Sequence, residues 1–276
     1  MKSIEGKVIL VTGASSGIGK ALANFLAASG AKVYGTSRRP PDSGAEDAVA
    51  ADDRRVIMIQ LDVRSDESVS KAVRRVMDIE GRIDVLVNSA GFTLAGAVED
   101  VSLAEAQGQF DTNFFGVLRM CREVLPGMRR RSGGLIINIS SVAGLVPLPY
   151  QSMYSASKYA VEAVTEAIRM ETKPFGIRAV LIEPGDTKTN CTANRQMAAA
   201  TAGSVYEKSC MKAVSTMARS EQSAPEPRAI LRVVLRVIGR KNPPVRIAIG
   251  FEYKVVGFLA RVLPARLVEF AMRKVY

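Results

Sequence analysis

Residues 7–30 of the chain are KVILVTGASSGIGKALANFLAASG, and the order of residue types in this stretch decides the fold. A β-branched run over residues 7–12 predicts a strand, and an alanine-rich pattern to about Ser29 predicts a helix. The turn between strand and helix contains three glycines, Gly13, Gly17 and Gly19. These glycines allow the backbone to approach a pyrophosphate, whose charge is favoured at a helix N-terminus. On this stretch alone, a purely structural tight turn remains the alternative.

Six further strand-like runs follow, and most of them alternate with helical patterns. The strands are predicted over residues 31–37, 55–63, 83–91, 134–141, 177–185 and 245–249, and helices over 65–80, 102–126 and 152–172. Residues 40–54 are polar and predict a loop or a short irregular helix. Strands that alternate with helices predict a parallel sheet with helices on both faces. We therefore expect a doubly wound, Rossmann-like α/β fold of about seven strands, in one domain spanning residues 1–276.

Composition narrows the class of protein. The chain has 276 residues, 47% of them apolar, which is enough for a substantial core. It contains no run of 18 apolar residues and starts without a signal-peptide pattern, so we expect a cytoplasmic protein. Three widely spaced cysteines suit a reducing compartment. The absence of histidine excludes Ser-His-Asp and Cys-His nucleophile systems and the commonest zinc sites, so no metal site is expected.

The net charge of +11 is concentrated at the C-terminal end. From Arg228 onward there are eleven Lys or Arg and two Asp or Glu, which gives 11 − 2 = +9 for this end and 11 − 9 = +2 for the first 227 residues. An arginine recurs every fourth residue along a predicted helix, at Arg228, Arg232, Arg236 and Arg240. Like charges at this spacing repel one another mildly, so the stripe favours an anionic partner.

A tyrosine and a lysine four residues apart, Tyr154 and Lys158, fall in the predicted helix 152–172. Side chains at i and i+4 lie on the same face of a helix, so the phenol would sit beside the ammonium. A tyrosine titrates near pH ~10, and a neighbouring cation lowers that pKa because it favours the phenolate. The pair therefore predicts an acid–base group, although the same spacing also arises by chance.

Several polar or turn-forming residues follow predicted strands, and in a parallel sheet the carboxyl ends of the strands form the ligand site. These residues are Gly13, Ser37, Asp62, Asn88, Ser141 and Pro184. Asp62 is placed to contact an adenine. The second strand ends in Ser37 and Arg38 where a carboxylate would favour NAD(H), and these side chains can donate to a 2′-phosphate. The pattern therefore favours NADP(H), with a solvated loop as the alternative.

Taken together, these motifs resemble the short-chain dehydrogenase/reductase family from Lys7 to about Thr189. The matching motifs are Thr12-Gly13 with Gly17 and Gly19, Asn88-Ser89-Ala90-Gly91, Asn113, Ser141, Tyr154 with Lys158, and Pro184-Gly185. The family usually has a second Asn where this chain has Ser89, which should affect loop packing more than chemistry. Residues 144–149, GLVPLP, and a length beyond 250 residues resemble the 17β-hydroxysteroid and retinol dehydrogenase branch. Some members of that branch hold a steroid with a histidine, which this chain lacks.

The resemblance implies a role for each matching residue. Tyr154 would be the general acid and base, and Lys158 would lower its pKa and bind the nicotinamide ribose. Ser141 would hydrogen-bond the reacting oxygen, and Asn113 would hold a water that passes protons to Lys158. The implied cofactor contacts are Gly13, Ser15, Ser16, Gly17, Ile18, Gly19, Ser37, Arg38, Asp62, Val63, Asn88, Ala90, Gly91, Tyr154, Lys158, Pro184, Gly185, Thr187 and Thr189. The substrate contacts would be Ser141, Leu148 and Tyr154.

The C-terminal third predicts a substrate lid over residues 186–222 and a basic extension over 223–276. Methionines in the lid, Met197, Met211 and Met217, predict either an adaptable apolar pocket or ordinary helix packing. Ser223 and Glu226 have the spacing of a capping box for the arginine helix. Two basic amphipathic segments, 253–263 and 265–275, predict either helices packed on the domain or peripheral membrane contact. No recognition motif accompanies the charge, so no nucleic acid is expected.

Together these features predict an NADP(H)-dependent oxidoreductase that transfers a hydride between nicotinamide and a hydrophobic ketone or secondary alcohol. The substrate would be steroid-, retinoid- or lipid-like. One alternative is a 3-oxoacyl-thioester reductase whose acidic carrier binds the basic end. An alternative of another class is a non-catalytic NADP(H) sensor or scaffold. The resemblance also implies a homodimer paired through the helices at 102–126 and 152–172.

Overall fold

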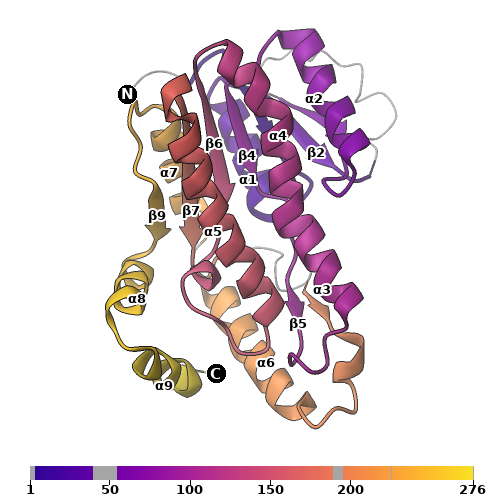
Figure 1. The fold of residues 1–276 in the computed structure, drawn as a ribbon, viewed down its shortest axis with the longest axis vertical. Helices are drawn as coiled ribbons and strands as arrows, with labels where there is room; N and C mark the ends of the chain where they lie inside the picture. The colour runs from indigo at the N-terminus through magenta and orange to yellow at the C-terminus, as the bar shows by residue number, and fades with distance from the viewer. Residues whose placement is uncertain (1–3, 40–54, 189–194, 225, 276) are drawn as a thin grey trace.

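The computed structural model describes residues 4–39, 55–188, 195–224 and 226–275. Its middle layer is a seven-stranded sheet of order β3-β2-β1-β4-β6-β7-β9 (Figure 1). The strands are β1 (Val8–Val11), β2 (Lys32–Ser37), β3 (Val56–Gln60), β4 (Val85–Asn88), β6 (Gly134–Ile139), β7 (Ile177–Pro184) and β9 (Arg246–Ile249). Every neighbouring pair is parallel; Leu10 of β1, for example, lies opposite Tyr34 of β2 and Leu86 of β4. The predicted doubly wound parallel sheet is confirmed.

Helices cover both faces of the sheet because residues along each strand point alternately to one face and the other. The helices are α1 (Gly17–Ala28), α2 (Asp66–Glu80), α3 (Leu103–Phe110), α4 (Gly116–Arg130), α5 (Ser152–Thr172), α6 (Glu207–Ser223), α7 (Arg228–Ile238), α8 (Phe251–Val262) and α9 (Ala265–Val275). Leu10 belongs to the core formed with α2, α4 and α5, and Ile9 to the core formed with α1 and α7. In Figure 1, α4 and α5 cross the front of the sheet, and α8 and α9 extend from its lower left.

The predicted helix over 102–126 is interrupted and longer than expected. A π-helical segment, Asp111–Phe115, separates α3 from α4, and α4 continues past Pro126 to Arg130. The prediction that Pro126 ends this helix is wrong. Proline removes one backbone hydrogen bond, but Val124 and Met128 on either side of it are buried against the sheet, and this packing keeps the helix intact.

The predicted capping box at Ser223 is also wrong. Ser223 is the last residue of α6, and α7 begins only at Arg228, directly after Pro227. The ring of Pro227 disfavours a helical conformation at the preceding residue, which delays the helix start. Two further strands, β5 (Leu94–Ala95) and β8 (Gln196–Met197), form a small separate sheet that the sequence analysis did not predict. Two-residue strands are too short to show a period of two.

Arg246 fixes the edge strand β9 to the sheet and to α5. Its guanidinium binds Glu162, and it lies 2.7 Å from Glu166 and 3.2 Å from Glu183. Glu162 and Glu183 are each only 4% exposed, so the cluster places two carboxylates and one guanidinium largely out of water. Burial, together with the negative charge of Glu183, raises the pKa of Glu162 from 4.5 to about 8.

This shift predicts that the stability of the protein falls as pH rises from about 4.5 to about 8. Between these values the folded state keeps a proton on Glu162 that the unfolded state has already lost, so the free energy of unfolding decreases with pH. Thermal melts across this range should show a smaller decrease for Glu162→Gln. Glu166→Gln is the matched control, because Glu166 binds the same arginine but is 44% exposed. Equal slopes for wild type and Glu162→Gln would contradict the prediction.

Candidate active site

The glycine-rich turn packs against the turn that follows β4. Gly13 has φ +69°, and a Cβ there would lie 2.8 Å from Ala90 Cα. A Cβ at Gly19 would overlap the carbonyl of Gly13. Thr12 Oγ1 accepts hydrogen bonds from the amides of Ser89 (3.0 Å) and Ala90 (3.1 Å). The two turns therefore form one rigid surface, and the Ser89 side chain takes no part in the bonds that hold it.

The first turn of α1 fits the phosphates of a dinucleotide. Gly17, the first residue of α1, has φ +55°, and no atom lies within 4 Å of where its Cβ would be. The N-cap Ser16 makes no side-chain capping bond, so the first N–H groups of the helix are not capped by that side chain. Open space beside uncapped N–H groups at a helix N-terminus suits an anion. The residues present thus fit the pyrophosphate that the sequence predicted at this turn.

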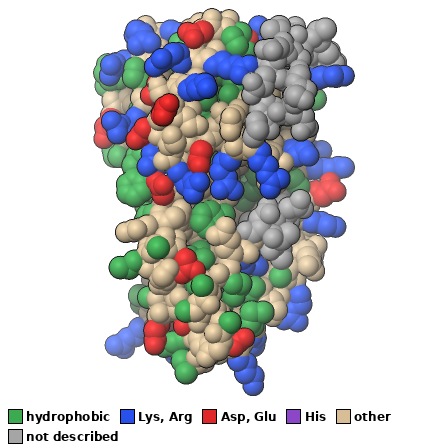
Figure 2. Space-filling view, turned by 90° about the vertical axis from the view of Figure 1, so that its right-hand side faces the viewer, with side chains coloured by type: hydrophobic (Ala, Val, Ile, Leu, Met, Phe, Trp, Pro, Cys, Tyr) green, Lys and Arg blue, Asp and Glu red, His purple; other side chains and the backbone are tan. Residues whose placement is uncertain are grey.

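Basic side chains cluster at the ends of β2 and β3. Figure 2 shows Lys and Arg side chains across the middle of the face turned to the viewer, beside Asp and Glu. Arg64 Nη2 lies 2.8 Å from Asp62 Oδ2, and this hydrogen bond lowers the pKa of Asp62, with a smaller contribution from the charge of Arg38. Arg38 itself is exposed. Arg64 was missed by the sequence analysis, although it follows the third predicted strand closely.

Tyr154 and Lys158 lie together at the start of α5, as their spacing predicts. The Lys158 Nζ is 5.7 Å from the centroid of the Tyr154 ring. Lys158 is only 8% exposed, and its ammonium donates a hydrogen bond of 2.9 Å to the carbonyl of Ile139, the last residue of β6. The cation is thus held largely out of water at the carboxyl end of a central strand, where its field acts more strongly than in solvent.

Ser141 lies two residues after Ile139, which accepts the hydrogen bond of Lys158, and Asn113 bonds the residue before Lys158. Ser141 follows β6 and caps the 3-10 turn Val142–Gly144; its Oγ accepts from the amide of Ala143 at 3.1 Å, which leaves its hydroxyl proton free to donate elsewhere. Asn113 is buried in the π-helical segment. Its side chain bonds both backbone groups of Phe92, at 3.1 and 3.0 Å, and Ser157 Oγ at 3.3 Å. Since Ser157 directly precedes Lys158, Asn113 connects the turn after β4 to α5.

A buried polar ladder below the site was not predicted. Asn88 Nδ2 donates to Asn138 Oδ1 at 2.8 Å, and Asn138 Nδ2 donates to Thr165 Oγ1 at 2.7 Å. These side chains connect β4, β6 and α5 inside the core. The sequence does contain a signal for these bonds. Asn138 lies inside the apolar run GLIINI, and a buried amide requires hydrogen-bond partners.

The turn after β7 is covered by a residue from the C-terminal extension. The ring of Tyr253 occupies the space where a side chain at Gly185 would project, and its hydroxyl accepts from the amide of Asp186 at 3.0 Å. Burial raises the pKa of Tyr253 to about 12, so this phenol stays neutral. Thr187 Oγ1 bonds the carbonyl of Gly185 at 3.1 Å. The predicted contact Thr189 lies outside the described residues.

The predicted substrate side is bounded by residues 144–149. The amide of Leu148 donates to Ser155 Oγ at 3.1 Å, which fixes this loop to α5 next to Tyr154. A cavity of about 740 Å³ opens beside the loop and is lined in part by Pro149, Tyr150 and Tyr206. Tyr154 does not line this cavity, and neither do Ser141, Asn113 or Lys158.

The three methionines for which the sequence left pocket lining and helix packing open have different surroundings. Met211 is 50% exposed and Met197 is 37% exposed, whereas Met217 is buried with its sulfur 2.9 Å from Gln151 Nε2. Residues 198–204 are hydrogen-bonded to β5 and to the segment that follows it. The amide of Ala198 donates to the carbonyl of Ala95 at 2.8 Å, and Ser204 Oγ donates to Asp100 Oδ1 at 2.7 Å.

These site residues lie in a part of the chain that matches a known protein family. The short chain dehydrogenase family model matches residues 7–200, which include all the residues predicted to bind the cofactor or take part in catalysis. The chain belongs to the short-chain dehydrogenase/reductase family. It is therefore placed among oxidoreductases that act on hydroxyl and keto groups, as the sequence predicted.

Two members of the short-chain dehydrogenase/reductase family are similar to this chain in sequence. A 3-ketodihydrosphingosine reductase of Bacteroides thetaiotaomicron is 38% identical over 275 residues, which cover 99% of each chain. Human retinol dehydrogenase 8 is 42% identical over 188 residues, which cover 66% of this chain and 60% of its own length. The second match supports the retinol dehydrogenase-like branch that the sequence predicted.

Solved structures of the family have the same fold. A short-chain dehydrogenase from Streptomyces avermitilis is 34% identical with a TM-score of 0.81, covering 98% of this chain and 97% of its own. A short-chain dehydrogenase from Burkholderia cenocepacia, solved in complex with NADP, is 25% identical with a TM-score of 0.70, covering 95% of each chain. The chain thus shares its fold with a family protein that binds a nicotinamide cofactor.

Proposed function

We propose that this protein is an NADP(H)-dependent reductase of hydrophobic ketones, acting through Tyr154, Lys158, Ser141 and Asn113. The observation that carries the proposal is the Lys158 ammonium, buried and 5.7 Å from the Tyr154 ring. The intact pair also argues against a non-catalytic sensor, because a sensor has no need of a phenol beside a buried cation.

Each of the four residues has a distinct task in this proposal. When bound, NADPH supplies the hydride that reaches the carbonyl carbon. Tyr154 donates a proton to the carbonyl oxygen, and Ser141 donates a hydrogen bond to the same oxygen. Lys158 stabilises the phenolate that Tyr154 becomes. The side chain of Asn113 already makes hydrogen bonds to Phe92 and Ser157. A water at this residue would therefore bind through its main-chain carbonyl.

The cofactor would be held along the carboxyl ends of the strands. Its pyrophosphate would lie at Gly17 and the start of α1, and its 2′-phosphate near Ser37 and Arg38. Arg64 adds a third group at this end, although its guanidinium is already bound to Asp62. The basic surroundings support NADP(H) over NAD(H), because they favour an additional phosphate.

A long-chain ketone is the substrate class that we favour. The loop over residues 145–149, LVPLP, is apolar, and the amide of its Leu148 bonds Ser155, the residue that follows Tyr154. A relative that matches 99% of the chain is named a 3-ketodihydrosphingosine reductase. A 3-oxoacyl thioester remains the rival substrate, since it has a ketone at a comparable position and its carrier would suit the basic C-terminal end.

A panel of ketones tests the proposal. NADPH oxidation should be measured with 3-ketodihydrosphingosine, with its homologues of shorter alkyl chain, with retinal, with a steroid ketone and with 3-oxoacyl thioesters. Burying a methylene contributes about 0.8 kcal/mol, so kcat/KM should rise up to about fourfold per methylene until the pocket is filled. A flat chain-length series would contradict the hydrophobic substrate, and a preference for thioesters would favour the rival. No turnover with any ketone would favour the sensor.

The homodimer remains part of the proposal. Exposed apolar side chains, Phe115 (47%) directly before α4 and Tyr159 (42%) and Met170 (70%) on α5, support pairing through these two helices. The division of the chain into one domain with a lid over 186–222 and an extension over 223–276 also remains a prediction.

A further inference from the structure

The two C-terminal helices expose an unusual amount of apolar surface. On α8, the exposed fractions are 79% for Phe251, 65% for Phe258 and 57% for Val262; on α9, they are 52% for Leu267 and 58% for Phe270. Phe251, Phe258 and Val262 are spaced seven and four residues apart, so they share one face of α8. Had these helices simply packed on the domain, this face would be buried. No residue of α8 is.

The orientation of α8 is fixed by contacts on its opposite side. Tyr253 packs on Gly185 and bonds the amide of Asp186, as described above. Gly257 lies against Leu145, whose Cδ1 would be 3.0 Å from a Cβ at this glycine. Phe251 and Val262 therefore point away from these two contacts, whereas Phe258 also borders the space between α7 and α8.

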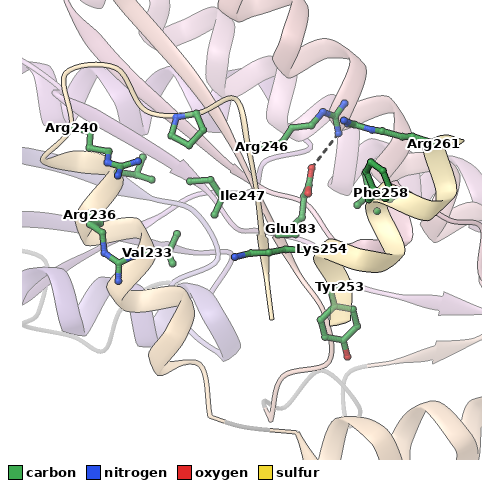
Figure 3. Close-up of a pocket in the computed structure, with 15 residues that line it drawn as sticks. Glu183, Val233, Arg236, Arg240, Arg246, Ile247, Tyr253, Lys254, Phe258 and Arg261 are labelled. Atoms are coloured by element: carbon green, nitrogen blue, oxygen red, sulfur yellow. Dashed lines mark hydrogen bonds and ion pairs between the residues drawn. The ribbon is translucent and has the colours of Figure 1, made fainter. Parts of the chain in front are cut away.

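A cavity of about 460 Å³ lies between α7 and α8, beside the edge strand β9. Five basic side chains line it, Arg236, Arg240, Arg246, Lys254 and Arg261, above apolar residues such as Val233 and Ile247. Lys254 extends from α8 toward α7, where Arg236 and Arg240 lie (Figure 3).

Within the part of the chain that the structure describes, four of these five cations have no carboxylate partner. Arg246 binds carboxylates there, among them Glu183, the one acidic residue of the described lining. Among the described residues, Arg236, Arg240, Lys254 and Arg261 have no ion-pair partner. Cations that converge without counter-charges repel one another unless an anion binds between them.

We propose that α8 and α9 dock this protein on a membrane that contains anionic phospholipids. The phosphate of one lipid binds the cavity between α7 and α8, and Phe251, Phe258, Val262, Leu267 and Phe270 enter the acyl-chain boundary. A phospholipid carries an anion and an apolar chain in one molecule, which matches cations that border an apolar face. Within residues 4–39, 55–188, 195–224 and 226–275, no helix could span a bilayer.

The positive charge of the cavity favours a phospholipid over a second copy of the chain, and the apolar face favours it over an acidic carrier protein. A second copy of the chain would bring the same unneutralised cations to a twofold interface, where they would repel. An acidic carrier protein would satisfy the cations, but it would leave the apolar face without a matching surface. This inference does not depend on the proposed hydride transfer, because the docking residues lie outside the Tyr154 cluster.

Vesicle binding tests the proposal with the full-length protein. Co-sedimentation should be measured with vesicles of phosphatidylcholine alone and with an equal mixture of phosphatidylcholine and phosphatidylglycerol. We expect at least about tenfold tighter binding to the anionic vesicles, and about a tenfold loss in Arg236→Gln/Arg240→Gln. Phe251→Ser/Phe258→Ser should weaken binding by a similar factor without lowering Tm, since both side chains are exposed. Lys71→Gln/Arg122→Gln, which removes two exposed charges from α2 and α4, is the matched control and should bind like wild type.

A fluorescent reporter gives an independent readout. The chain has no tryptophan, so Phe258→Trp introduces a single one, whose emission should shift to the blue on anionic vesicles. Ile79→Trp, at a site 52% exposed on α2, should not shift.

Equal binding to both kinds of vesicle, no binding, or unchanged binding in the variants would overturn the proposal. Self-association abolished by Phe251→Ser/Phe258→Ser would assign the face to a second copy, and capture of an acidic carrier protein in place of vesicles would assign it to that partner. Turnover of a short soluble ketone by the docking variants shows that the reaction is intact whatever the vesicles do.

Discussion

Tyr154→Phe should lower kcat for ketone reduction by about 10²- to 10⁴-fold, because it removes only the hydroxyl that donates the proton. The ring remains, so its packing beside Lys158 is preserved and Tm should change little. NADPH binding, followed by the change in its fluorescence, should weaken by no more than about tenfold, since one hydrogen bond contributes about 0.5–1.5 kcal/mol. Single-turnover measurements with saturating NADPH separate the chemical step from binding.

The matched control for this substitution is Tyr159→Phe. Tyr159 lies on the same helix, five residues later, and is 42% exposed. Removing its hydroxyl should leave the rate unchanged. Substantial turnover by Tyr154→Phe, or an equal loss in both variants, would mean that the proton comes from another group. An unchanged pH–rate profile in a slow Tyr154→Phe variant would lead to the same conclusion.

The second large effect concerns cofactor choice. Ser37→Asp combined with Arg38→Ile should lower the ratio of kcat/KM for NADPH over NADH by about 10²-fold or more. Two changes contribute: the loss of charge-assisted hydrogen bonds to the 2′-phosphate, each about 1.5–3 kcal/mol, and the repulsion of that phosphate by the new carboxylate. Steady-state kinetics with both cofactors measure the ratio directly.

Arg74→Ile is the control for the cofactor pair, because it removes an exposed positive charge on α2 and leaves the end of β2 intact. We expect it to leave the ratio unchanged. If the double variant keeps the wild-type preference, the 2′-phosphate is held elsewhere, and Arg64 is the first residue to replace next. If wild type already prefers NADH, the interpretation of Ser37 and Arg38 is wrong.

Much of this architecture follows from local sequence patterns. The seven strands of the main sheet and the helix 152–172 were predicted within a few residues, because long apolar runs and regular spacing are strong signals. The motifs at the strand ends follow from the same prediction, since parallel strands bring their carboxyl ends together. What the patterns missed depends on contacts between distant segments. The short β5–β8 pairing joins residues about 100 apart, and α4 continues through Pro126 because both sides of it pack on the sheet.

The surroundings of the C-terminal helices α8 and α9 could not be predicted from local sequence either. Their amphipathic sequences predicted helices at the right positions, but not whether the apolar side would be covered, because that depends on which surfaces remain beside them. The sequence left packing and membrane contact open, and the exposed fractions of Phe251 and Phe258 now favour the second. The Asn88–Asn138–Thr165 ladder likewise required the register between strands, which no single stretch contains.

Tyr253 occupies the space left by the missing side chain at Gly185, and this has a consequence for how the chain can vary. The tail beyond residue 250 contains none of the family's motif residues, yet shortening it would uncover the turn at which the sequence places the nicotinamide end of the cofactor. Homologues that dispense with the tail must therefore fill that gap with another group. A larger residue at position 185 should appear only in chains that have also lost the tyrosine.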